Sequence, residues 1–241
     1  MKKLILILCV LQMNLSAAHN ILLHCGRLID TEKGVVLTKK TVIVSGEKIK
    51  AIKNGFVVPE NPKDVVVDLK SKTVMPGLID MHVHMENEYN PARYMDQFTA
   101  NEADVAFKSV NYAEITLLAG FTTVRDLGGT GVNIALRNAI NNNTIVGPRI
   151  FTAGKAIATT GGHADPTNGR NKLLMGDPGP EQGVINSPDE ARKAVRQRYK
   201  NGADNIKITA TGGVLSVAKN GQNPQFTIEE VKAICATAKD Y

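Results

Sequence analysis

The 241-residue sequence contains no tryptophan, and aromatic residues make up only 5% of it. Proteins that bind single-stranded nucleic acid stack the bases on aromatic side chains, so this scarcity argues against such binding. The formal net charge is +6, but the lysines and arginines are scattered and form no basic run. We therefore interpret the charge as that of a solvated surface and expect no nucleic-acid partner.

Cysteine is also scarce, and Cys9, Cys25 and Cys235 are the only three in the chain. Their spacing does not indicate a zinc pair, and it neither requires nor excludes a disulfide between Cys25 and Cys235. No glycine-rich dinucleotide fingerprint follows a predicted strand, which argues against a nucleotide-binding open sheet.

The N-terminus has the pattern of a targeting segment. Met1–Lys3 is positively charged, Leu4–Leu11 is apolar but too short to span a bilayer, and Ser16–Ala18 supplies small residues for cleavage. This order predicts a signal peptide over residues 1–18, a secreted or periplasmic protein, and no membrane association after cleavage. A buried strand or helix is the alternative.

Two regions follow. Residues 19–72 hold four short runs rich in β-branched residues, at 21–23, 41–44, 49–52 and 65–69, separated by turn signals. They predict the N-terminal part of a small β-sandwich domain that takes further strands from elsewhere in the chain.

Strands and helices alternate four times over residues 73–241. Strands are predicted at 74–84, 121–125, 149–153 and 205–209, and helices at 99–119, 132–141, 187–200 and from 227 onward. The alternation favours a parallel α/β fold, either an open doubly wound sheet or half of a (β/α)8 TIM-type barrel. Residues 154–187 form a long segment that is expected to be functional or disordered. The last helix reaches Tyr241 without a stop signal, so the sequence is expected to be truncated.

The candidate metal ligands begin with His82 and His84. Side chains alternate along a strand, so both imidazoles point the same way, in a barrel toward the rim where catalytic groups gather. Two neutral imidazoles that converge in this way indicate a transition-metal site. The alternative is a pair of histidines bonded to backbone or carboxylate groups.

Lys207 is the second candidate. Ile206 and Ile208 share one face of the predicted strand, and Lys207 lies on the other. If the isoleucines pack under helices, Lys207 points inward, where a lone ammonium tends to lose its proton. A neutral amine can take up carbon dioxide as a carbamate, which can bridge two metal ions. The alternative is a lysine paired with an acidic residue of another strand.

The stretch Met75–His84 resembles the signature of the amidohydrolase superfamily, in which Pro-Gly and an Asp-x-His-x-His sequence close the first barrel strand. Gly202–Ile208 with Thr211–Gly213 resembles the imidazolonepropionase-like branch, which contains Xaa-Pro dipeptidases. Thr122–Gly129 and Thr160–His163 match the same branch. The resemblance covers all of the chain after the signal peptide, but the later histidines and aspartate of the family are absent.

The resemblance implies the first half of a metal-dependent amidohydrolase barrel over residues 73–241. His82, His84 and a carboxylated Lys207 would bind metal, with two zinc ions per intact site. His163 would be catalytic and face the substrate, or else be an exposed loop histidine. Arg125 and Asp126 would form an ion pair that holds the ligands, or one that is only structural.

The expected activity is hydrolysis of amide bonds in dipeptides or N-acyl amino acids, with metal-bound hydroxide as the nucleophile. The partner is therefore a small molecule or dipeptide, and homo-oligomerisation stays open. The 241 residues alone are expected to be inactive and prone to aggregate. A mononuclear, imidazolonepropionase-like cyclic amidohydrolase and a non-enzymatic degenerate relic are the alternatives.

Overall fold

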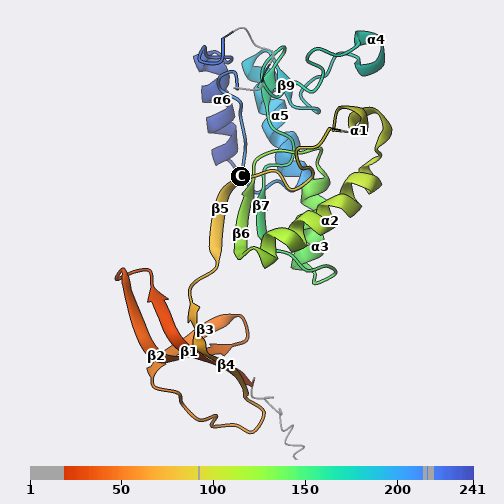
Figure 1. Cartoon of the computed structure of the whole chain (residues 1–241). Coiled ribbons are helices and arrows are strands. Elements are labelled where there is room, and N and C mark those ends of the chain that lie inside the picture. The colour runs from red at the N-terminus through yellow and green to blue at the C-terminus, as the bar shows by residue number, and fades with distance from the viewer. Residues whose placement is uncertain (1–18, 92, 214–215, 217–219) are drawn as a thin grey trace, which may run out of the picture. The chain divides into compact units, whose positions relative to one another are not determined.

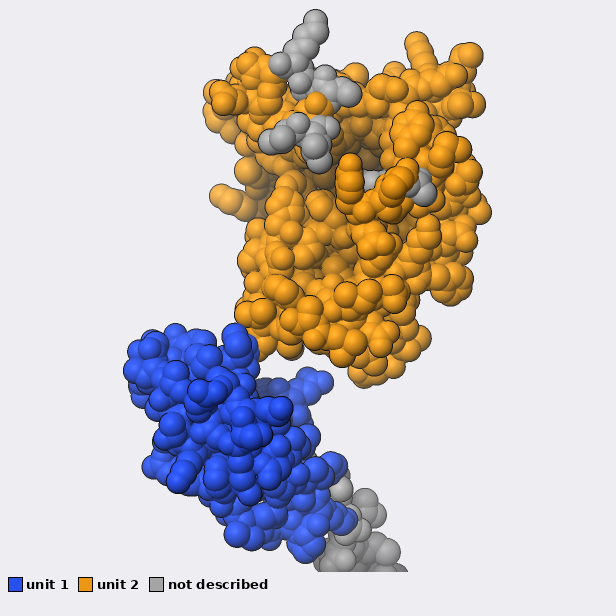
Figure 2. All heavy atoms as spheres, in the orientation of Figure 1, with its two compact units in different colours: residues 1–76 blue, residues 77–241 orange. Residues whose placement is uncertain are grey.

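The computed structural model describes residues 19–91, 93–213, 216 and 220–241. The predicted signal peptide, with Cys9, lies outside the described residues. The chain divides into two compact units, residues 1–76 and 77–241, which are coloured separately in Figure 2. Within the described ranges, no helix is long and apolar enough to cross a membrane.

Unit 1 is a four-stranded sheet with the strand order β3-β2-β1-β4 (Figure 1). The strands are β1 (Asn20–Asp30), β2 (Val35–Ser45), β3 (Lys48–Asn54) and β4 (Val65–Val74). β1 pairs with β2 antiparallel and with β4 parallel, and Cys25, Leu28 and Val42 form its buried centre. All four predicted strands are therefore present. The β-sandwich stays a prediction.

A break in the pairing of β1 with β4 between Cys25 and Arg27 depends on Gly26. A Cβ atom added to Gly26 would lie 1.9 Å from the carbonyl oxygen of Lys70, which is backbone and cannot rotate away. We expect Gly26→Ala to lower the free energy of unfolding of unit 1 by about 3 kcal/mol, the upper range for overpacking. Urea unfolding followed by circular dichroism measures this change.

Gly34→Ala is the matched control for that experiment. Gly34 has φ +66°, and an added Cβ would meet no atom within 4 Å. It should cost only about 1 kcal/mol, from backbone strain alone. Equal losses in the two variants would contradict the steric account.

Unit 2 is built on a parallel three-stranded sheet, β5-β6-β7 (Figure 1). Its strands are β5 (Leu78–Val83), β6 (Phe121–Asp126) and β7 (Arg149–Thr152). The predicted strand 74–84 is thus wrong as one element. Val74 ends β4 in unit 1, and Pro76, which has no N–H to donate to a ladder, precedes β5.

The helices of unit 2 include one for each of the four predicted helices and two short ones that the sequence did not predict. They are α1 (Arg93–Thr99), α2 (Glu102–Leu118), α3 (Val132–Asn141), α4 (Lys172–Met175), α5 (Pro188–Asn201) and α6 (Ile228–Lys239). Ser187 caps α5 by accepting a hydrogen bond from the N–H of Glu190 at 3.3 Å. Thr227 and Glu230 form the predicted capping box of α6.

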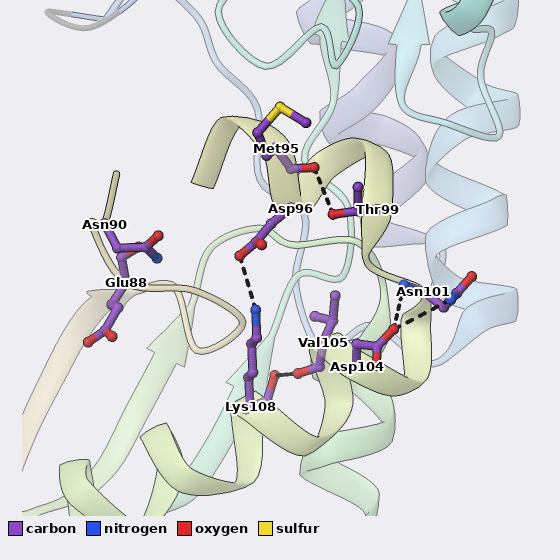
Figure 3. Close-up of polar contacts among 10 residues, drawn as sticks. Glu88, Asn90, Met95, Asp96, Thr99, Asn101, Asp104, Val105 and Lys108 are labelled. Atoms are coloured by element: carbon purple, nitrogen blue, oxygen red, sulfur yellow. Dashed lines mark hydrogen bonds and ion pairs between the residues drawn. The ribbon is translucent and has the colours of Figure 1, made fainter. Parts of the chain in front are cut away.

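The predicted helix 99–119 corresponds to α2, which begins three residues later, at Glu102, because Asn101 is its N-cap. Asn101 has an extended backbone (φ −86°, ψ 167°), and its N–H donates to Asp104 at 2.9 Å, which begins α2. Figure 3 shows this contact together with the ion pair between Lys108 of α2 and Asp96 of α1, at 3.0 Å. The pair ties the two helices together across the break.

The predicted strand 205–209 does not form a regular strand. One parallel bridge joins Ile208 to Ile157, supported by hydrogen bonds from Ile157 N to Lys207 O (2.8 Å) and from Thr209 N to Ile157 O (3.1 Å). In the segment beside it, Gly154 has φ +62°, which is outside the range of a regular strand. The segment still runs beside residues 152–157, as a fourth parallel strand would.

The long segment 154–187 is partly ordered by short elements. It contains β8 (Ala158–Thr159), which pairs parallel with β9 (Val184–Ile185), and the short helix α4. Buried Arg198 of α5 donates to the carbonyl oxygens of Lys155 (2.7 Å) and Glu181 (3.1 Å). Both ends of the loop are thereby fastened to one helix.

Candidate functional site

The four residues predicted as metal ligands or catalytic groups line one pocket. His82, His84, His163 and Lys207 surround a cavity of about 650 Å³. The pocket lies where β5 and β6 end and where the loop after β7 folds back. Convergence of these side chains is the geometry that the sequence predicted, whereas their roles stay predictions.

His82 and His84 lie side by side at the end of β5, with ring centroids 5.5 Å apart. The Nδ1 atom of His84 is 2.7 Å from the carbonyl oxygen of Gly128. Because a carbonyl can only accept, Nδ1 must carry the proton, and Nε2 keeps a free lone pair. Partial burial, followed by the positive charge of Lys207, holds the pKa of His82 below its ordinary value. His82 therefore favours the neutral form that binds metal.

Lys207 points into the pocket because its neighbours are anchored on the other side. Ile206 and Ile208 pack against the buried cluster formed with α5 and α6. Among the ion pairs of the described residues, none involves Lys207. The described residues thus supply no ion-pair partner for Lys207, and the alternative of an acidic residue from another strand stays a prediction.

His163 reaches the pocket from the loop after β7. Its backbone N–H donates to the side-chain oxygen of Gln225 at 2.9 Å. A Cβ atom added to Gly213 would lie 2.3 Å from Cε1 of His163, so the ring lies directly over this glycine. The two glycine-containing motifs noted in the sequence, Thr160–His163 and Thr211–Gly213, thus meet in space.

Arg125 and Asp126 do not form an ion pair in the structure. The prediction of an ion pair, whether to hold the ligands or only for structure, is therefore wrong. Consecutive residues of β6 point to opposite faces. Arg125 donates to the carbonyl oxygen of Met81 at 2.8 Å. Asp126 is fully buried and accepts from the N–H groups of Met85 and Gly128, both at 3.1 Å. Burial raises the pKa of Asp126.

The donor set fits a divalent metal ion in its chemistry. Neutral imidazoles and a lysine that can carry a carbamate are nitrogen and oxygen ligands suited to zinc. Where the structure describes the chain, no three His, Cys, Asp or Glu side chains lie close enough to hold a metal. Lys207 would therefore have to act as the third ligand of this chain. Cys25 is buried in unit 1 and Cys235 is exposed on α6, and both are free thiols.

The sequence did not single out Lys155 and Glu102, which also line the pocket. Glu102 is the first residue of α2, where an acidic residue has an ordinary helix-stabilising role, so nothing in the sequence marked it. Lys155 stands in a loop whose return to the pocket depends on the contacts of Arg198. Only the tertiary structure brings Lys155 and Glu102 to the pocket.

Comparison with known proteins identifies the family and the fold. Residues 73–241 match the family model described as the Amidohydrolase family. The crystal structure of a Xaa-Pro dipeptidase with bound methionine is 51% identical with a TM-score of 0.86, covering 92% of this chain and 54% of that chain. A prolidase complexed with N-methylphosphonate-L-proline is 32% identical with a TM-score of 0.79, with the same coverage.

Curated relatives point the same way. Ochratoxinase of Aspergillus niger is 29% identical over 90% of this chain and 47% of its own length. Dihydroorotase of Geotalea daltonii is 27% identical over 92% and 50%. The chain thus spans about half the length of these relatives and covers part of a TIM-barrel-type fold. The resemblance seen in the sequence motifs is confirmed: this chain belongs to the amidohydrolase family.

Proposed function

We propose that the intact protein is a metal-dependent hydrolase of amide bonds in dipeptides or N-acyl amino acids. The observation that carries the proposal is the convergence of His82, His84, His163 and Lys207 on one pocket. The similarity to a Xaa-Pro dipeptidase and a prolidase supports this substrate class. The partner would be a small peptide-like molecule, and the predicted signal peptide supports a secreted or periplasmic location.

Each side chain has a proposed task. His82 and His84 would bind metal through neutral imidazoles, and a carboxylated Lys207 would bridge two zinc ions. When bound, the metal lowers the pKa of a coordinated water and polarises the scissile carbonyl. His163, held over Gly213, would donate a hydrogen bond to the substrate carbonyl. Lys155 adds a positive charge to the same pocket.

A second candidate is a hydrolase of a cyclic amide that uses one metal ion. The match to a dihydroorotase over 92% of this chain is the observation behind the substrate class, and it does not bear on the number of metal ions. Metal analysis and ¹³C NMR of the purified protein supplied with ¹³C-bicarbonate distinguish the two candidates, because the carbamate is labelled without the protein being denatured or acidified. Two metals per chain and a carboxylated Lys207 support the dipeptidase proposal, whereas one metal and an unmodified lysine support the cyclic amidohydrolase.

Metal removal tests the proposed activity directly. We expect the intact, zinc-loaded protein to hydrolyse Xaa-Pro dipeptides and N-acyl amino acids, and dialysis against a chelator to abolish the turnover. Added zinc and bicarbonate should restore it, because the imidazoles remain in place and Lys207 can be carboxylated again. Turnover that survives complete metal removal would contradict the proposal. His82→Gln should likewise lose turnover, and His24→Gln, which alters a histidine of unit 1 that contacts the carbonyl oxygen of Val57, is its matched control.

A further inference from the structure

A buried carboxylate behind the pocket has no role in the site as described above. Glu86 is 5% exposed and comes two residues after His84. Its two oxygens accept hydrogen bonds from the backbone N–H groups of Thr130 (2.6 Å) and Asn133 (2.7 Å). These groups flank Gly131, the N-cap of α3, which has no side chain to cap the helix. Glu86 therefore caps a helix 47 residues further along the chain.

The Glu86 carboxylate also determines where the loop between β6 and α3 lies. A Cβ atom added to Gly129 would be 2.4 Å from Oε1 of Glu86, so the carboxylate lies directly against this glycine. Gly129 donates its own N–H to the carbonyl oxygen of Gly154 at 3.0 Å. The loop is thus fixed from one side by Glu86 and from the other by the chain after β7.

The residue before Gly129 is the one that contacts His84. The Gly128 carbonyl accepts from Nδ1 of His84 at 2.7 Å, while the Gly128 N–H donates to Asp126. The Gly128 carbonyl belongs to the peptide that joins residues 128 and 129, so a displacement of Gly129 that turns this peptide takes the acceptor away from the imidazole proton. The choice of tautomer at His84 therefore depends on the loop that Glu86 holds.

We propose that Glu86 is a positioning residue that keeps the Gly128 carbonyl against the Nδ1–H group of His84 and so leaves Nε2 of His84 free to bind metal. The proposal rests on the proposed function only in treating His84 as a metal ligand. The hydrogen-bond relay itself is independent of substrate and of turnover.

The test measures the tautomer of His84 in the metal-free intact protein. Protein labelled with ¹⁵N-histidine is studied by NMR at a pH where the imidazoles are neutral, and the His84 signals are assigned by their absence in His84→Gln. We expect the Nδ1–H tautomer in the unmodified protein. In Glu86→Gln the amide NH2 would face one of the two backbone N–H groups, so one hydrogen bond is lost and His84 should shift toward the Nε2–H tautomer.

Two further variants separate positioning from a general loss of stability. Glu230→Gln makes the same substitution at an equally buried glutamate, also 5% exposed, that caps α6 by accepting from Thr227 N at 2.7 Å. It should leave the tautomer of His84 unchanged. Gly129→Ala pushes the Glu86 carboxylate away without altering it, and should shift the tautomer as Glu86→Gln does. If Glu86→Gln does not fold, the tautomer of His84 is measured in Gly129→Ala instead.

Zinc affinity provides the second measurement. We expect Glu86→Gln to weaken zinc binding by about 10-fold or more, the usual effect of removing a group that orients a ligand. The proposal is overturned if His84 lacks the Nδ1–H tautomer in the unmodified protein, if folded variants retain it, or if Glu230→Gln shifts it equally. Failure of the hydrolase proposal would appear instead as absent turnover with the tautomer shift intact.

Discussion

Lys207→Met is expected to lower kcat/KM of the intact protein by about 1000-fold, because loss of the bridging carbamate removes metal-derived stabilisation of about 4 kcal/mol. Methionine matches the length of the lysine stem but cannot react with carbon dioxide. Ile206 and Ile208 keep their packing against α5 and α6, so the fold should persist. Steady-state kinetics with an Xaa-Pro dipeptide and metal analysis measure the effect.

Two further variants serve as a partial rescue and as a control for Lys207→Met. Lys207→Glu places a carboxylate on a shorter stem and should retain more metal and more activity than Lys207→Met. Lys193→Met alters an exposed lysine of α5 and should behave like the unmodified protein. Full activity in Lys207→Met would show that the amine has no part in the reaction.

Asp126→Ala is expected to lower the free energy of unfolding by about 3 kcal/mol, because buried donors would lose their acceptor. Asp126 is 0% exposed and accepts from Met85 N, Gly128 N and Asn133 Nδ2, the last at 3.2 Å. Urea unfolding measures the change. Asp189→Ala, an exposed aspartate at the start of α5, is the control and should cost far less.

The pH dependence of stability offers a separate test of this carboxyl group. Burial raises the pKa of Asp126 in the folded protein, so folding favours the protonated form. Its contribution is fully present below the ordinary aspartate pKa and is lost as the pH rises through the raised value. Asp126→Asn cannot ionise. We therefore expect the stability of the unmodified protein relative to Asp126→Asn to fall over that window and then level off. A difference independent of pH would contradict the raised pKa.

Much of the local structure could be predicted from the residues alone. Helices 132–141 and 188–201 follow from apolar periodicity and from Ser187 as N-cap, and the β-branched runs of unit 1 are strands. The inward direction of Lys207 was predicted because side chains alternate along an extended chain. The errors arose at residues 74–78, where Pro76 separates β4 from β5, at 99–102, where the helix starts later than predicted, and at 205–209, where a single bridge replaces a strand.

The contacts of the site depend on residues that are far apart in the chain. Asp126 and Arg125 are neighbours in sequence, yet one is buried against Met85 and Gly128 and the other bonds the chain at Met81. Glu86 and Glu88 look alike in the sequence, and only folding brings Glu86 to the start of α3. No local sequence pattern predicts a hydrogen-bond partner that lies so far along the chain.

The amino-acid sequence by itself determined the alternation of strands and helices, the shared face of His82 and His84, and membership of the amidohydrolase family. These depend on local periodicity and short motifs. Only the tertiary structure decided which carbonyl holds His84, which carboxylate holds the loop carrying that carbonyl, and that Lys207 has no acidic partner among the ion pairs of the described chain. The physical reason is that a buried hydrogen bond is selected by packing between distant segments, where direction and distance, rather than residue type, decide the partner.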